Sequence, residues 1–476
     1  MFTLFDEELD RTARRILAEH RDFDSAAPAP ERLAQLRLDR LRESVRYARE
    51  HSPYYAATLA HLSRDRIAEL TPESLAELPF TTKDDLRSEM FRMLAKPVSK
   101  AWIYYETTGT TGRATPCPRD NVDSLVNNTA LTVCYEQIFR QHGSDHVVGV
   151  MGPTEMHATG DTFGDVCRNL GHAVVKLWPH SPVVGFRRAL EVLRELSVTV
   201  VFCTPGMAMS LAKQAAELGL DPRADFSIRA FMFTGELATP ELLANIGAEW
   251  GATAYNCLYA SQEASVLGAV HADGRLRTIP LNVFYEVVDP DTGEPAVAEE
   301  GGPREGELVV THLYQGSKPL IRYRTGDLVR LFPAEPGQRY PSETMVPVGR
   351  ARDRIDLNGS LVTGYDLESL ILAGLAGCRD YQIVIDEVDG TDRLTVQIEV
   401  DWDEQRLAAR ESALRDAVRE AWGCVLVLER KRLGAVTTTG ALVSWKAARI
   451  HDLRKNAGSE PEREAALAIA GRRESR

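Results

Sequence analysis

The chain has 476 residues and a formal net charge of -13 at pH 7, with 44% hydrophobic and 26% charged residues. This length exceeds what one hydrophobic core usually supports, so at least two folded units are expected, and the composition is that of a globular rather than a disordered protein. The acidic balance leaves no general basic surface for a phosphate backbone and argues against nucleic acid as a partner.

The sequence also bears on the compartment. The N-terminal segment carries Asp6, Glu7, Glu8 and Asp10 where a secretory signal would carry basic residues and an apolar stretch. No run of about 18 to 20 apolar residues predicts a membrane-spanning helix. The seven cysteines are odd in number and form no C-x-x-C pair, which favours neither a disulfide framework nor a zinc ribbon. We therefore expect a soluble protein of the reducing cytoplasm, with no membrane partner.

In chain order, residues 5–89 are charged and helix-like, with Leu36, Leu38, Leu41 and Val45 spaced for one helix face. Between about 100 and 350, β-rich runs at 199–204 and 229–234 alternate with helical stretches at 207–218 and 240–250. Such alternation is typical of an α/β sheet domain.

The pattern changes after Gly349. Leu394, Val396, Ile398 and Val400 alternate as in a half-buried strand, and a helical stretch follows at 405–422. We therefore predict an α/β protein with a large N-terminal sheet-and-helix domain over 1–350, its first 99 residues helical, and a small mobile α+β domain over 351–457. Residues 458–476 lack an apolar stripe, and we expect a frayed helix or a flexible tail.

The segment with the strongest chemical signal is a hydroxyl-rich glycine loop after a β-like run. It comprises Thr107, Thr108, Gly109, Thr110, Thr111 and Gly112. Glycines let the backbone approach a polyanion, and hydroxyl and amide groups then donate hydrogen bonds to its oxygens. The spacing is not that of a Walker loop. The pattern predicts a phosphate-binding loop, and a plain threonine-rich turn is the alternative reading.

Several further segments occur in the order known from one family. They are His51-Ser52-Pro53-Tyr54-Tyr55, Leu78-Pro79-Phe80-Thr81-Thr82-Lys83-Asp84-Asp85-Leu86-Arg87, Phe233-Thr234-Gly235-Glu236, Tyr259-Ala260-Ser261-Gln262-Glu263, Pro319-Leu320-Ile321-Arg322-Tyr323-Arg324-Thr325-Gly326-Asp327 and Val348-Gly349-Arg350-Ala351-Arg352-Asp353. Together with the loop they resemble the adenylate-forming superfamily, specifically its phenylacetate-CoA ligase-like branch. The likeness runs from the N-terminal region to about Arg454.

The resemblance implies roles for the central segments. Glu263 would hold magnesium, for which a hard carboxylate is suited, and Asp327 would accept hydrogen bonds from both ribose hydroxyls. The adenine and substrate pocket would be formed by Thr234, Gly235, Glu236, Tyr259, Ala260, Ser261 and Gln262. Family members usually have glycine and then threonine or serine where this chain has Ala260 and Gln262, so an altered pocket floor is expected.

Near the C-terminus, the resemblance gives Arg350 a contact with ribose or phosphate and places a hinge at Arg352 and Asp353. Lys446 would bridge the substrate carboxylate and the α-phosphate. The family usually has glycine before this lysine, whereas this chain has Trp445. Lys431 and Lys455 are competing candidates for the same role.

A group of histidines could suggest a metal site, but His142, His146, His157, His172 and His180 fit no usual zinc spacing. The resemblance instead implies an ATP- and magnesium-dependent enzyme. It would activate a small, aromatic acid as an adenylate and transfer it to CoA or another nucleophile. The alternatives are an ATP-dependent diazotase that activates nitrite for reaction with an aryl amine, an amide-forming ligase, or an inactive nucleotide-binding module. The sequence does not predict the oligomeric state.

Overall fold

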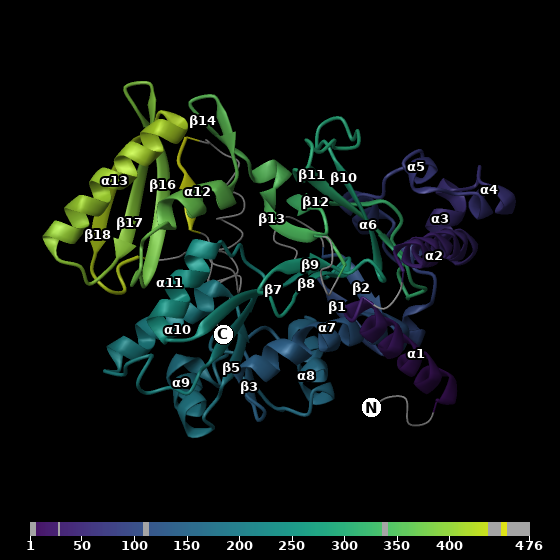
Figure 1. Cartoon of the computed structure of the whole chain (residues 1–476), viewed down its shortest axis with the longest axis horizontal. Coiled ribbons are helices and arrows are strands. Elements are labelled where there is room, and N and C mark those ends of the chain that lie inside the picture. The colour runs from purple at the N-terminus through teal and green to yellow at the C-terminus, as the bar shows by residue number, and fades with distance from the viewer. Residues whose placement is uncertain (1–5, 27–28, 108–113, 336–340, 437–448, 455–476) are drawn as a thin grey trace. The chain divides into compact units, whose positions relative to one another are not determined.

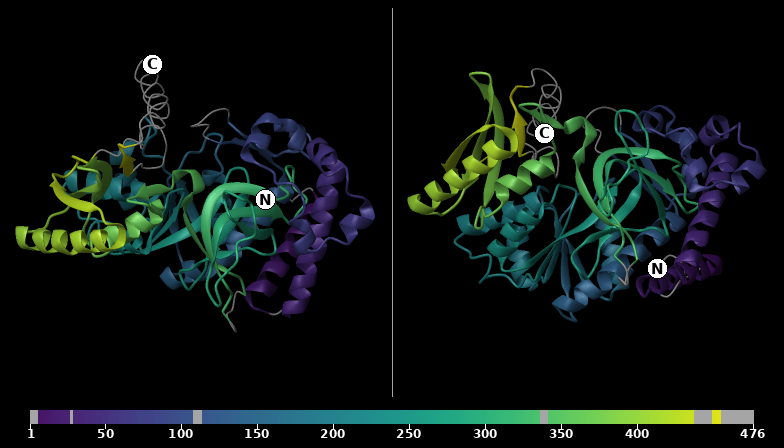
Figure 2. Two further views of the ribbon diagram at one scale, coloured as in Figure 1. Left: turned by 90° about the horizontal axis from the view of Figure 1, so that it is seen from above. Right: turned by 45° about the horizontal axis from the view of Figure 1, so that its top comes forward.

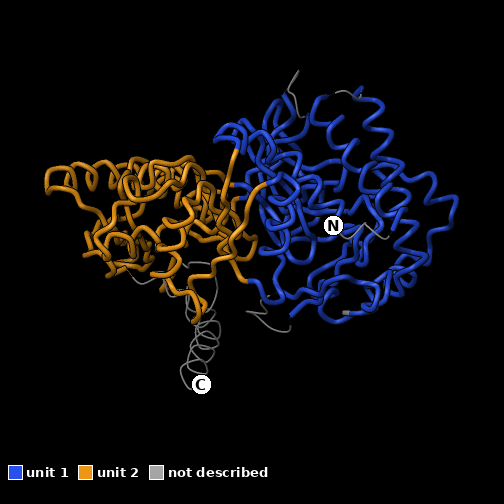
Figure 3. Tube along the Cα trace, turned by 90° about the horizontal axis from the view of Figure 1, so that it is seen from below, with its two compact units in different colours: residues 1–144, 154–171, 257–347 blue, residues 145–153, 172–256, 348–476 orange. Residues whose placement is uncertain are grey.

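The protein is described by a computed structural model over residues 6–26, 29–107, 114–335, 341–436 and 449–454. It divides into two compact units, shown in different colours in Figure 3. The first comprises residues 1–144, 154–171 and 257–347, and the second comprises 145–153, 172–256 and 348–476. The large sheet-and-helix part and the smaller C-terminal sheet confirm the predicted α/β fold class.

The first unit begins with the predicted helical region (Figure 1). Its helices are α1 (Glu7–Asp24), α2 (Pro30–His51), α3 (Pro53–Thr58), α4 (Arg64–Ala68), α5 (Pro72–Leu75), α6 (Lys83–Ser88), η1 (Met90–Met93), η2 (Val98–Lys100), α7 (Asn121–His142) and α8 (Thr159–Asn169). Leu41 and Val45 of α2 are fully buried in a core shared with the strands of this unit, because the apolar face predicted from their spacing packs inward.

A hairpin and a run of mixed strands complete the first unit, which includes β7 from residue 257 and β13 up to residue 347. The antiparallel hairpin consists of β1 (Ile103–Glu106) and β2 (Pro116–Arg119). The strands follow the order β10-β11-β12-β13-β9-β8-β7. Their bounds are β7 (Thr253–Ser261), β8 (Ser265–Val270), β9 (Leu276–Thr278), β10 (Val283–Val288), β11 (Arg304–His312), β12 (Tyr323–Phe332) and β13 (Thr344–Arg350).

The second unit contains parallel strands in the order β6-β5-β3-β4. These are β3 (Val147–Val150), β4 (Ala173–Lys176), β5 (Val200–Cys203) and β6 (Ala230–Thr234), with the helices α9 (Gly185–Glu195), α10 (Pro205–Glu217) and α11 (Pro240–Trp250). The helices predicted at 207–218 and 240–250 are confirmed. Thr204 and Thr239 cap α10 and α11, each with proline at the first helical position.

The same unit holds the C-terminal sheet, in the order β18-β17-β16-β19. Its elements are η3 (Ala351–Asp353), β14 (Ile355–Leu357), β15 (Ser360–Val362), α12 (Gly364–Leu372), β16 (Asp380–Val388), β17 (Thr391–Glu399), α13 (Glu404–Trp422), β18 (Val425–Lys431) and β19 (Ile450–Asp452). Leu394, Val396 and Ile398 are fully buried, as their alternation predicts. Strands β17 and β18 are parallel, which requires a crossover, and α13 supplies it along one face of the sheet (Figures 1 and 2).

All seven cysteines are buried and free. Among the described helices, none combines the length and apolar character needed to cross a bilayer. The predicted tail at 458–476 lies outside the described residues.

Candidate functional site

The predicted phosphate-binding loop joins the two strands of the β1–β2 hairpin. The hairpin continues one pair beyond the strands, since the Thr107 amide donates to the Thr115 carbonyl at 3.2 Å and the Thr115 amide donates to the Thr107 hydroxyl at 2.9 Å. The Glu106 amide donates to the Met156 carbonyl at 3.0 Å, which attaches the hairpin to the segment before α8. Thr108, Gly109, Thr110, Thr111 and Gly112 lie outside the described residues.

A second motif docks directly on the strand that carries Asp327. The Thr81 amide donates to the Arg322 carbonyl, and the Arg324 amide donates to the Thr81 carbonyl, both at 2.9 Å. Thr82 then caps α6 through a capping box with Asp85. Lys83 is therefore the first residue of a helix, where the helix dipole disfavours a positive charge.

The carboxylate of Glu263 neutralises the charge of Lys83 at this unfavourable position. It lies 2.8 Å from the Lys83 ammonium, and the Glu263 side chain is 6% exposed. Burial acts to raise the pKa of Glu263, but Lys83 and a backbone hydrogen bond outweigh it and hold the pKa below its usual range. The group is thus ionised at neutral pH. An ionised, buried oxygen donor fits magnesium, provided that phosphate oxygens and water complete the shell.

Asp327 lies within β12 at an irregularity where the pairing with β11 shifts register. Gly326 has φ +76°, and its amide donates to Glu307 at 3.0 Å, while the Asp327 amide donates to the Thr325 hydroxyl at 3.1 Å. The Tyr259 hydroxyl donates to Asp327 Oδ2 at 2.7 Å. Burial and this carboxylate raise the pKa of Tyr259 above its usual range, so the phenol stays protonated and orients Asp327.

The residues between Tyr259 and Glu263 form an irregular strand end. The pairing of β7 with β8 shifts register between Tyr259 and Ala260, and the Ser261 hydroxyl accepts a hydrogen bond from the Ala264 amide at 3.0 Å. Gln262 is partly buried. A bulge of this kind re-aims side chains next to a site, and here it separates the tyrosine that holds Asp327 from the buried carboxylate.

In the second unit, Thr234 ends β6, and Gly235 and Glu236 follow it directly. Gly235 has φ +86°, a conformation that favours glycine. The Glu236 carboxylate accepts a hydrogen bond from the Gly206 amide at 2.9 Å, in the first turn of α10, and lies 3.6 Å from the Arg449 guanidinium. The predicted adenine segment is thus attached to the residue three positions after Lys446.

The remaining predicted site residues are Arg350, Arg352, Asp353 and Lys446. Arg350 ends β13 and is exposed, and Arg352 forms an ion pair of 3.5 Å with its neighbour Asp353 in η3. Lys446 lies outside the described residues. The role of each of these residues stays a prediction.

Sequence reasoning missed three contacts: Lys83 with Glu263, Tyr259 with Asp327, and Arg449 with Glu236. All of these residues except Arg449 lay within a quoted motif, but none of the partners could be read from spacing. For Lys83 a local signal existed, because a lysine at the first position of a capped helix is electrostatically unfavourable.

Comparison with known proteins decides the family. Residues 26–314 match the AMP-binding enzyme family. The chain belongs to this family. A phenylacetate-coenzyme A ligase of Aromatoleum evansii is 29% identical over 378 residues, which cover 77% of this chain and 82% of that protein. The phenylacetate-coenzyme A ligase of Escherichia coli (strain K12) is 26% identical over 453 residues, covering 90% and 96%.

Among solved structures, 2-hydroxyisobutyryl-CoA ligase in the postadenylation state with 2-HIB-AMP matches with a TM-score of 0.74 at 21% identity. The match covers 94% of this chain and 93% of that one, and it shows the shared fold. By its family match and its phenylacetate-coenzyme A ligase relatives, this AMP-binding enzyme is AMP-forming and acid-CoA ligase-like, and it activates an acid by forming an adenylate.

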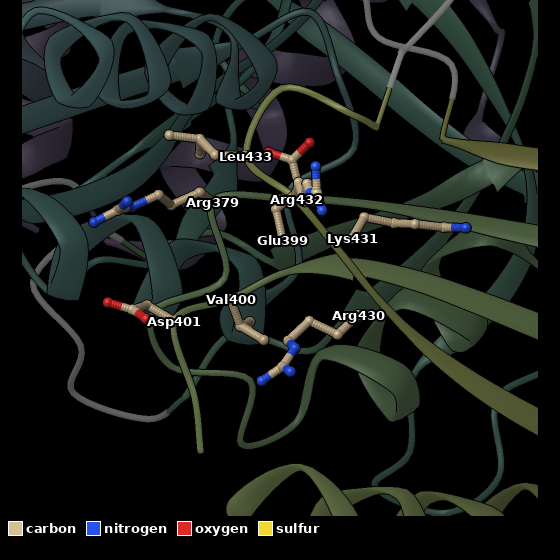
Figure 4. Close-up of a pocket in the computed structure, with 8 residues that line it drawn as sticks. All are labelled: Arg379, Glu399, Val400, Asp401, Arg430, Lys431, Arg432 and Leu433. Atoms are coloured by element: carbon tan, nitrogen blue, oxygen red, sulfur yellow. The ribbon is translucent and has the colours of Figure 1, made fainter. Parts of the chain in front are cut away.

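A pocket of about 350 Å³ in the C-terminal sheet of this AMP-binding enzyme is lined by four basic side chains (Figure 4). Arg379, Arg430 and Lys431 extend in different directions there. They form ion pairs with Glu249, Glu404 and Glu429, respectively. Because three of the four cations are already paired and do not converge, the pocket is not a candidate anion site.

Proposed function

We propose that this enzyme uses magnesium-bound ATP to activate a small aromatic acid as its adenylate and then transfers the acyl group to CoA. The observation that carries the proposal is Asp327, held by Tyr259 at 2.7 Å at the end of the Arg322-Tyr323-Arg324-Thr325-Gly326-Asp327 motif. The aromatic substrate class and the CoA acceptor are suggested by the names of the phenylacetate-coenzyme A ligases that are 26 to 29% identical.

In the first step an oxygen of the acid attacks the α-phosphorus of ATP. The bond from that phosphorus to the bridging oxygen breaks, and the electron pair leaves with pyrophosphate. Such a transfer needs positioning and charge stabilisation more than covalent help from the protein. In the proposal Asp327 positions the ribose and Thr107 to Gly112 hold the departing phosphates.

The other groups complete these roles. A magnesium ion held by Glu263 would supply charge neutralisation to the phosphates. Lys446 would stabilise the charge that spreads between the acid and the α-phosphate. In the second step the CoA thiol, deprotonated as it attacks, displaces AMP from the acyl carbon, and a rotation at Arg352 and Asp353 would exchange the face of the C-terminal domain presented to the adenylate.

Exchange of labelled pyrophosphate into ATP tests the proposal. A panel of acids, including phenylacetate and nitrite, is assayed with and without CoA and with aryl amines, and the products are identified by mass spectrometry. We expect acid-dependent exchange, AMP as product, and an acyl-CoA with an aromatic acid. Release of ADP and phosphate would contradict the adenylation step, whereas nitrite-dependent coupling to an aryl amine would replace the CoA ligase proposal with a diazotase.

We predict that Asp327→Ala weakens ATP binding, because each hydrogen bond to a charged group contributes about 1.5 to 3 kcal/mol. Calorimetric titration of the folded variant measures the loss. Tyr259→Phe is the matched control: it removes only the hydrogen bond that orients Asp327, and it should cost about 0.5 to 1.5 kcal/mol. Unchanged ATP affinity in Asp327→Ala would remove this carboxylate from the nucleotide site.

A further inference from the structure

Two buried cations lie at the base of the β1–β2 hairpin. Lys318 is 6% exposed, and its ammonium donates to the Pro116 carbonyl at 3.2 Å and lies 3.4 Å from Cys117 Sγ. Arg119 is 7% exposed, and its guanidinium lies 5.1 Å from the centre of the Tyr105 ring. Within the part of the chain that the structure describes, neither cation forms an ion pair with a carboxylate.

Buried charges are normally paired, since removing an ion from water costs several kcal/mol. The acidic groups whose fields reach these cations are already bound elsewhere. Glu263 is paired with Lys83. Asp123 accepts hydrogen bonds from the Asp120 amide at 2.9 Å, in the capping box of α7, and from the Ser317 amide at 3.0 Å, and burial together with Asp120 raises its pKa. Positive charge therefore exceeds negative charge here.

Polar atoms without partners gather in the same segments. Among the buried side-chain atoms that have no hydrogen-bond partner among the described residues, Thr115 Oγ1, Arg119 Nε, Gln262 Nε2 and Ser317 Oγ belong to these segments, and the acceptor His312 Nδ1 is a fifth. The first four can donate a hydrogen bond. Buried donors without partners are rare and costly, so these four, one on Arg119 itself and one on the neighbour of Lys318, favour an acceptor-rich anion as the missing partner.

His312 adds no further charge to this group. Its Nε2 lies 3.1 Å from the Ala264 carbonyl, and burial together with Lys318 and Arg119 lowers its pKa to about 4. The histidine is thus neutral at pH 7. The positive charge of this region comes from Lys318 and Arg119, with Lys83 paired beside them.

We propose that Lys318 and Arg119 bind the pyrophosphate portion of ATP at the base of the hairpin and stabilise it as it departs. This inference rests on the adenylation chemistry proposed above. Pyrophosphate gains negative charge as the bond to the α-phosphorus breaks and the bridging oxygen takes the electron pair. Fixed cations in a region shielded from water stabilise that charge more than they stabilise intact ATP.

The test compares Lys318→Met with Lys100→Met, a matched loss of an exposed lysine in the same unit. Calorimetry measures the binding of magnesium pyrophosphate and, separately, of AMP. We expect pyrophosphate affinity to fall about tenfold or more in Lys318→Met, as for a lost hydrogen bond to a charged group, with AMP affinity unchanged. Lys100→Met should bind both ligands normally. Arg119→Met should show the same selective loss and serves if Lys318→Met does not fold.

Thermal unfolding separates binding from a structural role. Because Lys318→Met removes an unpaired buried charge, the midpoint of thermal unfolding without ligand should be at or above that of the unaltered protein. Pyrophosphate should raise the midpoint of Lys318→Met less than it raises that of the unaltered protein. A lowered midpoint with normal pyrophosphate binding would assign Lys318 to folding and overturn the inference. Failure of the unaltered protein to bind AMP would instead count against the proposed function.

Discussion

Replacement of Lys446 by alanine should lower the rate of adenylate formation by about a hundred- to a thousand-fold, the usual effect of removing one preorganised electrostatic contact. ATP binding should be spared, because the charge is needed only when the transition state spreads negative charge between the acid and the α-phosphate. Single-turnover formation of adenylate, together with ATP titration, measures the two quantities separately.

The controls use the competing lysines. Lys431 lies on β18 and forms an ion pair of 2.7 Å with Glu429, so Lys431→Ala should remain near normal, and we expect the same of Lys455→Ala. Supply of a presynthesised adenylate should restore the second half-reaction in Lys446→Ala, since the lysine is expected to leave the site by then. Normal adenylate formation in this variant would assign the bridging role to another residue, with Trp445 marking a rearranged C-terminal segment.

The elements that the sequence predicted best are those with strong local signals. Helices α10 and α11 each start with a threonine cap followed by proline, and α11 ends at Gly251 in the left-handed conformation. Strand β17 follows a strict alternation that places Leu394, Val396 and Ile398 in the core. Caps and periodicity act over a few residues, so they can be read without the tertiary structure.

The contacts that build the candidate site could not be predicted in this way. Lys83 and Glu263 are distant in sequence, and Thr81, which pairs with Tyr323 of β12, leads directly into the helix that begins with Lys83. Tyr259 reaches Asp327 through pairing among strands of the same sheet. Strand order and register depend on how whole elements pack, which no local pattern encodes. The division at residue 350 and the hinge at Arg352 and Asp353 remain predictions.

The largest stability effect is expected at Arg449, which lies in the second unit within a cluster of acidic side chains. Its guanidinium lies 3.6 Å from both Glu236 and Asp380 and 5.0 Å from the centre of the Tyr381 ring. The residue is 7% exposed. The Tyr381 hydroxyl in turn donates to Glu368 at 2.7 Å. Arg449 thus lies among several buried carboxylates, of which it shares Asp380 with Lys213.

Arg449→Met should therefore lower the free energy of unfolding by about 3 to 5 kcal/mol, the usual cost of leaving one side of a buried ion pair uncompensated. In Arg449→Met, Asp380 still forms an ion pair of 3.0 Å with Lys213, so the loss of stability should come mainly from Glu236 and Glu368. Urea denaturation measures it. Arg415→Met, which breaks an exposed ion pair of 2.8 Å with Glu411, should change stability by about 0.5 kcal/mol or less.

The pH dependence of the free energy of unfolding identifies which carboxylate is responsible for the destabilisation by Arg449→Met. Burial raises the pKa of Glu368 to about 7, while Arg449 acts to lower it. A carboxyl whose pKa is raised by folding binds a proton in the folded state, so its contribution to stability falls as pH rises between its unfolded pKa and about 7. Without Arg449 the pKa of Glu368 rises further, and the stability of the protein continues to fall with pH above 7. The destabilisation by Arg449→Met should thus be larger at pH 8 than at pH 6.

A second substitution tests this explanation. In a Glu368→Gln background no proton is bound or released at this position, so the extra loss at pH 8 should disappear, while the part due to Glu236 remains. If Arg449→Met destabilises the protein equally at both pH values, Arg449 acts through Glu236 and Asp380 alone. The attachment between the segment after Lys446 and the segment after β6 would then be a pH-independent ion pair, and the rate of adenylate formation in Arg449→Met should fall to the same extent at pH 6 and pH 8.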